Sequence, residues 1–294
     1  MSMEQLLRNV QTIIKAEPVI EGAGVKLQRS IGGQSLRDLD PFLLFDHFGS
    51  RKAEDYQAGF PMHPHRGIET VTYMLTGEVH HRDTLGNTGS IGPGDVQWMT
   101  AGGGIMHEEM PQVRPEGNEG FQLWVNLPAT RKMTQPRYQN ISSQAIPEVT
   151  THEGAHIRVL AGNVEGVEGP VTGVGVTPTY LDVFLPAHCA FTHYLPRGQT
   201  AFAYIFEGTV AFANNKPETP TRISHSRLLV LDNGERVTMS TDDEPARLLL
   251  IAAQPLHEPI VCYGPFVMNT KTEIEQALRD LQQGTFIWSE QRHS

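Results

Sequence analysis

The sequence predicts an all-β protein built from two tandem, jelly-roll-like β-barrel domains and a short C-terminal helix. Three observations predict this fold class. Short apolar, β-branched runs alternate with turns rich in Gly and Pro, which number 28 and 20 among the 294 residues. The two halves of the chain repeat each other, and a run with helical spacing occurs near the C-terminal end. Many short strands with a turn every eight to twelve residues are typical of a sandwich or barrel.

The first half of the chain contains a series of segments with strand character. Residues 25–31 alternate apolar and polar side chains, which is typical of a strand with one buried face. The apolar run 42–48 predicts a core strand. Residues 68–75 and 79–82 flank Thr76-Gly77-Glu78, so we expect a hairpin. Further strands are expected at 96–99, 105–110 and 121–127.

The second half repeats the first at an offset of 131 residues, because Tyr73-Met-Leu-Thr-Gly77-Glu-Val79 matches Tyr204-Ile-Phe-Glu-Gly208-Thr-Val210. The same register aligns Arg66-Gly67 with Arg197-Gly198. A unit repeated at a fixed offset indicates tandem copies of one fold. We therefore expect strands in the second half as well, at 157–160, 179–185, 201–206, 210–212, 228–231 and 247–252.

The domain boundaries follow from this repeat. We place an N-terminal metal-binding domain at 1–130, a linker at 131–147, and a C-terminal domain without metal ligands at 148–294. Basic and polar residues dominate the linker, as is common between domains. Near the end, Thr272-Glu273-Ile274-Glu275 is a capping-box pattern. Helical spacing of apolar residues then predicts a helix over 273–283, with Gly284 as its C-cap.

Composition excludes several classes of function. The formal net charge is −10 and no segment carries a Lys/Arg cluster, so direct nucleic-acid binding through phosphate neutralisation is disfavoured. No apolar run approaches the roughly 20 residues of a membrane helix, and no signal peptide is evident. The two cysteines, Cys189 and Cys262, are expected to be free thiols. We expect a cytoplasmic, monomeric protein with no membrane association.

The candidate metal ligands come as two pairs, His63-Pro-His65 and His107-Glu-Glu109. In a strand, residues i and i+2 point to the same face, so each pair can converge on one ion. Imidazole and carboxylate together suit divalent Fe, Mn, Ni, Cu or Zn. Three histidines and a carboxylate leave two positions open on an octahedral ion, as substrate and O2 require.

The identity of the fourth ligand stays open at this level. Glu69 lies four residues after His65 and shares its face if the strand is regular. The residues alone therefore support either Glu69 or Glu109. The nearby His47, His80 and His81 are expected to be solvated or to lie beside the site without binding the metal.

Several motifs carry a specific resemblance. Gly59-x3-His63-x-His65-x3-Glu69-x7-Gly77 resembles the first cupin motif, and the repeat resembles a bicupin. Longer strings across almost the whole chain resemble the pirin family. These strings are Asp40-Pro-Phe-Leu-Leu-Phe-Asp46, His63-Pro-His-Arg-Gly67, Pro93-Gly-Asp95, Gln97-Trp-Met-Thr-Ala-Gly102, Gly104-Ile-Met-His107, Gln122-Leu-Trp-Val-Asn-Leu127 and Gly264-Pro-Phe-Val-Met-Asn269.

The resemblance implies one non-haem iron, Fe(2+), in the N-terminal domain, held by His63, His65, His107 and Glu109. Glu69 would then lie beside the ligands. It also implies similarity to quercetin 2,3-dioxygenases, which cleave flavonols with O2 and release CO. Other members of the family are described as regulatory partners of transcription factors or metabolic enzymes. A glycine-rich loop separates Pro93-Gly94 from the second ligand pair, which departs from the general cupin motif but fits pirins.

The second copy serves as an internal control. At the offset of 131, His63 falls on Tyr194, His65 on Pro196 and Glu69 on Thr200. We therefore expect a single metal per chain. The two histidines of that region, His188 and His193, are expected not to be ligands.

Two functional hypotheses follow. In the enzymatic one, Glu109 accepts the proton of a flavonol 3-hydroxyl as general base. An apolar mouth formed by Phe60, Met62, Trp98 and Met99 would hold the flat aromatic substrate. The alternative is an iron- and redox-dependent binding protein that acts on a protein partner. A purely structural zinc site is disfavoured, because such sites usually have four Cys/His ligands and no open position.

Overall fold

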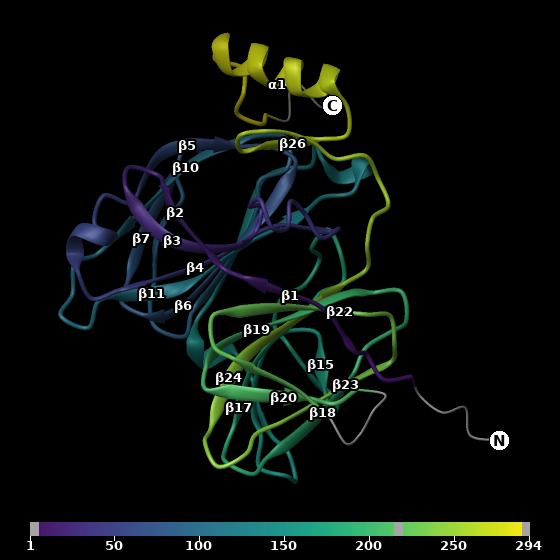
Figure 1. The fold of residues 1–294 in the computed structure, drawn as a ribbon. Helices are drawn as coiled ribbons and strands as arrows, with labels where there is room; N and C mark the ends of the chain where they lie inside the picture. The colour runs from purple at the N-terminus through teal and green to yellow at the C-terminus, as the bar shows by residue number, and fades with distance from the viewer. Residues whose placement is uncertain (1–5, 215–219, 290–294) are drawn as a thin grey trace. The chain divides into compact units, whose positions relative to one another are not determined.

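The computed structural model describes residues 6–214 and 220–289 (Figure 1). Strands dominate these ranges, and α1 (Lys271–Gln282) is their α-helix. The predicted all-β class with a short C-terminal helix is confirmed. No helix within the described ranges is long and apolar enough to cross a lipid bilayer.

The chain forms two compact units, and neither is continuous in sequence. The N-terminal barrel unit comprises Glu17–Ser143 and the residues from Leu256 onward. The C-terminal barrel unit comprises the residues up to Ala16 and Gln144–Pro255. These units differ from the contiguous domains expected at 1–130 and 148–294. The difference arises because residues 10–15 pair with residues 227–231, and residues 256, 280 and 288 hydrogen-bond to Asp40, Arg66 and Gly104, which no local pattern encodes.

The N-terminal barrel unit consists of two antiparallel sheets. The larger has the order β12 (Arg137–Ile141), β9 (Val96–Thr100), β6 (Ile68–Thr76), β11 (Asn118–Asn126), β4 (Phe42–Ser50), β3 (Val25–Ile31) and β2 (Glu17–Glu21). The smaller has the order β5 (Phe60–His65), β10 (Ile105–Pro111), β7 (Val79–Asp83) and β8 (Thr88–Ile91). The smaller sheet carries the predicted ligands.

The C-terminal barrel unit repeats this arrangement. Its larger sheet has the order β1 (Val10–Lys15), β22 (Arg227–Leu231), β19 (Thr200–Glu207), β24 (Ala246–Ala253), β17 (Thr179–Leu185), β14 (His156–Ala161) and β13 (Glu148–Thr150). Its smaller sheet has the order β18 (Ala190–Tyr194), β23 (Arg236–Ser240), β20 (Thr209–Phe212) and β21 (Thr221–Ser224). The matching strand orders show that the sequence repeat is a repeat of the fold.

The two large sheets have equivalent outermost strands that come from different parts of the chain. In the C-terminal barrel unit this strand is β1, which pairs with β22. In the N-terminal barrel unit the same place is taken by β12, which pairs with β9. Residues 137–141 were expected to be linker because they are polar, but polar residues are also typical of a strand at a sheet edge. The remaining elements are η1 (Ala53–Asp55), η2 (Ala129–Arg131), η3 (Ser143–Ala145), β15 (Asn163–Val164), β16 (Val167–Glu168), β25 (Val261–Tyr263) and β26 (Phe266–Met268).

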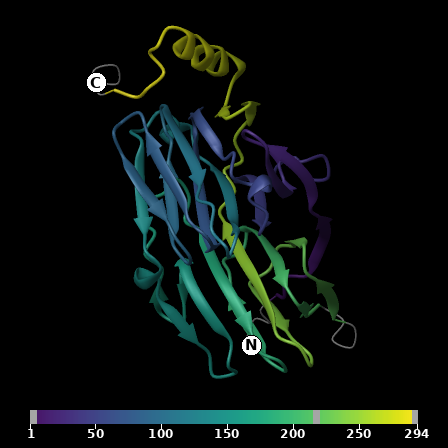
Figure 2. The same cartoon turned by 90° about the vertical axis from the view of Figure 1, so that its left-hand side faces the viewer.

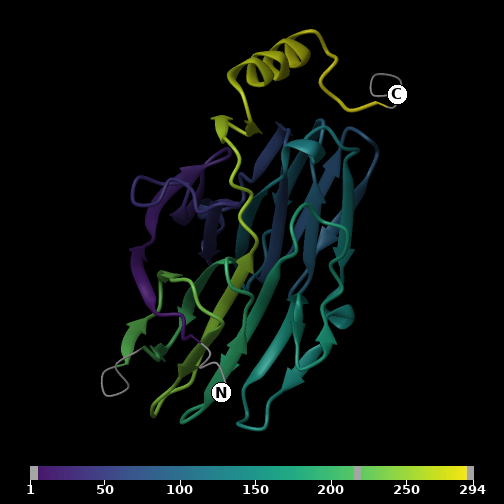
Figure 3. The ribbon, with the colours of Figure 1, turned by 90° about the vertical axis from the view of Figure 1, so that its right-hand side faces the viewer.

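The C-terminal helix lies beyond the ends of the blue strands of its own unit (Figure 2), as the view from the opposite side also shows (Figure 3). Its N-cap is Thr270, whose hydroxyl accepts from Glu273 N at 3.3 Å while Glu273 Oε2 accepts from Thr270 N at 2.8 Å. The capping box therefore begins two residues before the Thr272 that the sequence suggested. Gly284 follows the last turn with φ +69°, as predicted for a residue that ends a helix.

The apolar face of α1 packs within its own unit. Ile274 and Ala277 are buried in a cluster with Phe266, Met268 and Phe286.

The two cysteines, Cys189 (buried) and Cys262 (exposed), are both free thiols, as expected.

Candidate metal centre

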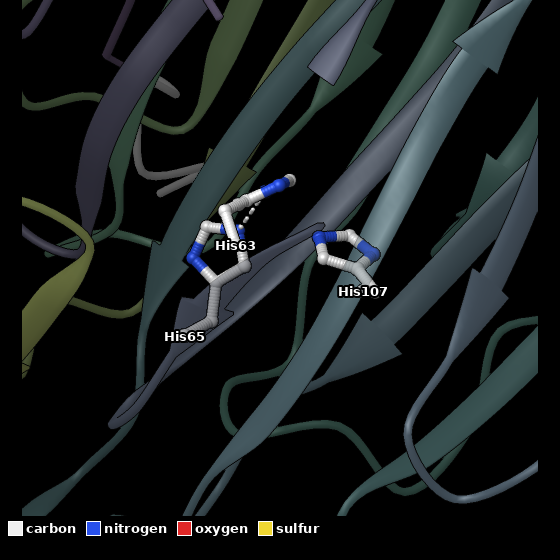
Figure 4. Close-up of side chains that lie close together, drawn as sticks. All are labelled: His63, His65 and His107. Carbon is white, nitrogen blue, oxygen red and sulfur yellow. Dashed lines mark hydrogen bonds between the residues drawn. The ribbon is translucent and has the colours of Figure 1, made fainter. Parts of the chain in front are cut away.

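Three histidines converge between two paired strands. His63 and His65 lie on β5, and His107 on the neighbouring β10, where it is directly opposite His63. One ring nitrogen from each of the three histidines lies within 4.8 Å of the other two (Figure 4). The period-two spacing thus places two ligands on one face of β5, as predicted, and the ladder register adds the third.

Hydrogen bonding orients the His63 ring. Its Nδ1 lies 2.9 Å from the Pro61 carbonyl, to which it can only donate, so Nε2 carries the lone pair. His63 Nε2 lies 2.9 Å from His65 Nε2. Two nitrogens each about 2.1 Å from one ion, at a right angle, would be about 3 Å apart. The spacing therefore suits two neighbouring ligands of one metal.

Burial keeps the other two rings neutral. Desolvation, reinforced by the neighbouring histidines, holds the pKa values of His65 and His107 well below the usual range. Both side chains are at most 2% exposed. Among the described residues, neither ring nitrogen of His107 has a hydrogen-bond partner. A buried, neutral imidazole without a partner costs free energy that a metal ion offsets, so the residues present fit a divalent metal.

Glu109 lies in the same cavity but outside the histidine cluster. Its Oε1 accepts from the Thr72 hydroxyl at 3.1 Å, and its Oε2 accepts from the Gln122 amide at 3.2 Å. The pairing of β10 with β5 shifts register between His107 and Glu109, a local irregularity that sets the carboxylate apart from the rings. Its role as fourth ligand stays a prediction.

Glu69, the rival fourth ligand, belongs to another strand. β5 ends at His65, and Gly67 with φ +80° turns the chain into β6 before Glu69 is reached. Glu69 is fully buried and accepts from Thr100 Oγ1 at 2.8 Å. Its carboxylate is not part of the histidine cluster. The assumption that one regular strand runs from His63 to Glu69 is therefore wrong.

A cavity of about 650 Å³ opens beside the histidines. This volume falls in the roughly 300–1,000 Å³ range of small-molecule sites. Its apolar walls include Val25, Leu27, Leu44, Phe48, Tyr56, Phe60, Trp124 and Val267. Its polar lining includes His63, His65, Glu109, Thr72, Asn118 and Gln122. The cavity thus combines apolar walls with polar groups beside the histidines, and its lining also includes the charged residues Glu21, Arg29, Arg37 and Asp46.

Of the four residues expected at an apolar mouth, Phe60 alone is part of the cavity lining. Met62 is 36% exposed. Trp98 and Met99 are at most 1% exposed because both faces of β9 are covered. Met99 packs in an apolar cluster with Ile68 and Ile105, so its place is in the core.

Sequence reasoning missed Thr72 and Gln122. Each is one of several polar residues in its strand, so no local pattern singled it out. His81, which was expected to be solvated or to lie beside the site, is 4% exposed and lies opposite Glu109 in the ladder between β7 and β10. By contrast, His80 is half-exposed and bonds to Glu78 at 2.8 Å, and His47 bonds to Glu119 at 3.1 Å.

The second barrel carries different residues at the corresponding place. The expected counterpart of His63 was Tyr194, which is 56% exposed, whereas the adjacent His193 is 7% exposed and faces the interior. His193 lies opposite Val237 in the ladder between β18 and β23. His193 therefore corresponds to His63 at an offset of 130 residues instead of 131. A shift of one residue exchanges the two faces of a strand.

Apolar side chains surround this interior histidine. Leu195, Val237 and Met239 belong to the buried core of the C-terminal barrel unit. Desolvation in this core lowers the pKa of His193 to about 4. The second barrel thus has one neutral histidine among apolar residues at the position that corresponds to the three-histidine cluster of the first barrel.

Comparisons with known proteins identify the family of the chain. Residues 24–125 match the model of the Pirin family, and residues 180–287 match the Pirin C-terminal cupin domain. A Pseudomonas aeruginosa protein whose name provisionally assigns it as a quercetin 2,3-dioxygenase is 44% identical over 94% of this chain and 97% of its own length. Human pirin is 42% identical over 89% of this chain and 88% of its own.

A solved structure shows the same fold over the whole length. The crystal structure described as quercetin 2,3-dioxygenase from Acinetobacter baumannii superposes with a TM-score of 0.84 and 35% identity. The match covers 96% of this chain and 99% of that chain. Common ancestry follows from the two family models and from relatives that share about two fifths of their residues with this chain over most of its length. This chain belongs to the pirin family.

Proposed function

We propose that the protein is a non-haem iron dioxygenase that cleaves the heterocyclic ring of quercetin or a related flavonol with O2, releasing CO and a depside. The observation that carries the proposal is the three-histidine cluster at a cavity of about 650 Å³ that also contains the Glu109 carboxylate. Relatives at 44% and 35% identity whose names cite this activity support it.

His63, His65 and His107 would hold the ion, with Glu109 as the predicted fourth ligand. Fe(2+) is our proposed metal, while Mn, Ni, Cu and Zn suit the same donor set. When bound, the ion supplies a Lewis acid and a one-electron redox centre with open positions for substrate and O2. The remaining chemistry belongs to the chain's own side chains.

In this proposal, Glu109 takes the proton of the substrate hydroxyl. The Thr72 hydroxyl has a single hydrogen but two acceptors in reach, Glu109 Oε1 at 3.1 Å and Gln122 Oε1 at 3.0 Å. Once Glu109 Oε1 carries a proton, it can donate to Thr72 Oγ1, and the Thr72 hydrogen is free for Gln122. The Gln122 amide continues to donate to Glu109 Oε2. The three side chains thus form a closed ring of hydrogen bonds around one added proton.

The cavity walls suit a flat aromatic substrate. Phe60, Phe48 and Trp124 contribute aromatic faces, and Val25 and Leu27 contribute aliphatic ones. Filling this space with an aromatic ring excludes water from the histidines and Glu109. Exclusion of water strengthens the electrostatic interactions on which proton transfer depends.

The test combines metal analysis with turnover. Protein reconstituted with Fe(2+) is assayed for O2 uptake and quercetin loss, and His63→Ala is compared with His80→Ala, whose side chain is half-exposed and outside the cavity. We expect turnover in the wild type and in His80→Ala, and loss of both iron and turnover in His63→Ala. Fully loaded wild-type protein without quercetin loss would refute the dioxygenase proposal. Undiminished turnover in His63→Ala would refute the site.

A loaded but inactive protein would favour the second hypothesis, an iron-dependent regulatory protein. This alternative is supported by relatives whose names cite no enzymatic activity, such as human pirin at 42% identity. In that case, the metal and its oxidation state would alter binding of a protein partner. Partner capture by Fe(2+)-loaded, Fe(3+)-loaded and apo protein would then distinguish the states.

A further inference from the structure

The C-terminal segment contacts both ligand-bearing strands at the same end. In the ladder between β5 and β10, His63 lies opposite His107, and His65 lies opposite Ile105. The next residues along this ladder are Arg66 and Gly104. Both of them contact the segment that follows α1, which belongs to the same unit.

Arg66 is the residue directly after the ligand His65. Its side chain is 4% exposed. Nη1 donates to Asp280 Oδ2 at 2.7 Å, and Nη2 donates to the Phe286 carbonyl at 3.0 Å. The guanidinium carbon also lies 4.5 Å from the centroid of the Phe286 ring. A planar cation with two directed hydrogen bonds and one aromatic contact is held in a single orientation.

Gly104 precedes the ligand His107 by three residues. Its carbonyl accepts from Trp288 N at 3.0 Å. A Cβ at Gly104, whose φ is +139°, would lie 2.3 Å from the Phe286 carbonyl oxygen, so the segment packs against bare backbone there. One carbonyl, that of Phe286, thus lies against Gly104 and accepts from Arg66.

The backbone on the far side of Arg66 is held by the chain just before α1. Arg66 forms a parallel bridge with Phe266, and Val267 N donates to the Arg66 carbonyl at 3.1 Å. Lys132 Nζ, which is buried, donates to the carbonyls of Gly67 at 2.9 Å and Val267 at 2.8 Å. Residues on both sides of α1 therefore fix the turn that follows His65.

We propose that Arg66 is a positioning residue for the metal centre. Through Asp280 and Phe286 it ties the end of β5 to the end of β10, and so sets the distance between the His63/His65 pair and His107. This role affects metal affinity, which can be measured whether or not the protein has dioxygenase activity. Groups that orient the ligands of a metal typically change its affinity by roughly 10- to 100-fold.

The second barrel provides a matched control. Arg197 occupies the corresponding Arg-Gly turn, but its side chain is 51% exposed and pairs with Glu235 at 3.1 Å. No cluster of three candidate ligands is found beside it among the described residues. Arg197→Met therefore removes an arginine from the same kind of turn without touching the metal centre.

The experiment titrates apo full-length protein with Co(II) or Ni(II) against a competing chelator, at a temperature where circular dichroism shows every variant to be folded. We expect Arg66→Met to weaken metal binding by roughly 10- to 100-fold and to alter the Co(II) visible spectrum, which reports ligand geometry. Arg66→Lys should recover part of the affinity, and Arg197→Met should match the wild type. Unchanged affinity and spectrum in folded Arg66→Met would overturn the proposal.

Asp280→Asn covers the case in which Arg66→Met does not fold. This substitution leaves one side-chain oxygen, which can still accept from Arg66, while the charge and the second acceptor, to which Gln276 donates at 2.7 Å, are lost. We expect it to fold and to weaken metal binding in the same direction by a smaller factor. Wild-type affinity in Asp280→Asn, or an equal loss in Arg197→Met, would contradict a positioning role.

Discussion

The Gln122 amide donates to Glu109 Oε2 at 3.2 Å, across two different sheets of the N-terminal barrel unit. Gln122 lies on β11 and also accepts from Thr72 on β6. The carboxylate is therefore oriented from the large sheet, while the histidines are held by the small one. This division makes the two halves of the site separable by mutation.

Replacing Gln122 with Leu removes a donor to Glu109 and leaves the histidines untouched. We expect kcat for quercetin to fall roughly 10- to 100-fold, because a misplaced base loses alignment with the substrate hydroxyl. KM should change little, since the apolar walls remain. Steady-state O2 uptake measures both parameters. Thr192→Val, on the surface of the other unit, is the control, and a Gln122→Leu enzyme with full kcat would contradict this role.

Phe60 and Met99 distinguish the cavity wall from the core. Phe60 lines the cavity, so Phe60→Ala should raise KM for quercetin with a modest loss of stability. Met99 is fully buried in an apolar cluster, so Met99→Ala should lower the free energy of unfolding by about 2–5 kcal/mol with KM unchanged. Denaturant unfolding and steady-state kinetics on both variants test the assignment. A raised KM in folded Met99→Ala would place Met99 in the substrate site after all.

The burial of His193 predicts that the C-terminal barrel unit loses stability at acidic pH. Burial lowers its folded-state pKa to about 4, below an unfolded value of about 6.5. The unfolded chain thus binds the proton more readily, and stability falls as pH drops from about 6.5 to about 4. The loss is about 3 kcal/mol in total.

His193→Leu should flatten this pH dependence, because leucine suits the surrounding Leu195, Val237 and Met239. Urea unfolding at several pH values between 4 and 7 measures it. His225→Gln, at an exposed position, should retain the wild-type slope. An unchanged slope in His193→Leu would assign the acid sensitivity to other groups.

The helix cap distinguishes two threonines that are two residues apart. Thr270→Ala removes the hydroxyl that accepts from Glu273 N, and should destabilise the helix by about 1 kcal/mol. Thr272→Ala, within the first turn and exposed, should leave stability unchanged or raise it by about a few tenths of a kcal/mol, because alanine has the higher helix propensity. Thermal unfolding of the two variants under identical conditions compares them directly. Equal effects would show that the capping box contributes nothing at Thr270.

The residues themselves predicted much of the fold. The strands expected at 25–31 and 179–185 coincide with β3 and β17, because alternation and β-branching are local properties. The repeat around Gly77 and Gly208 predicted two barrels, and equivalent strand orders confirm it. The two period-two pairs also contained the three histidines that converge. Strand geometry brings His63 and His65 together, and the register of β10 on β5 adds His107.

Tertiary structure decided what depends on pairing between distant segments. Glu69 is separated from the histidines by a turn at Gly67, and Glu109 is held by Thr72 and Gln122, which no spacing rule connects to it. The one-residue change that turns His193 inward is set by ladder register. The contacts of Arg66 with Asp280 and Phe286 join residues more than 200 positions apart. Local sequence determines which strands form, but the register and the chain ends determine which side chains meet at the metal centre.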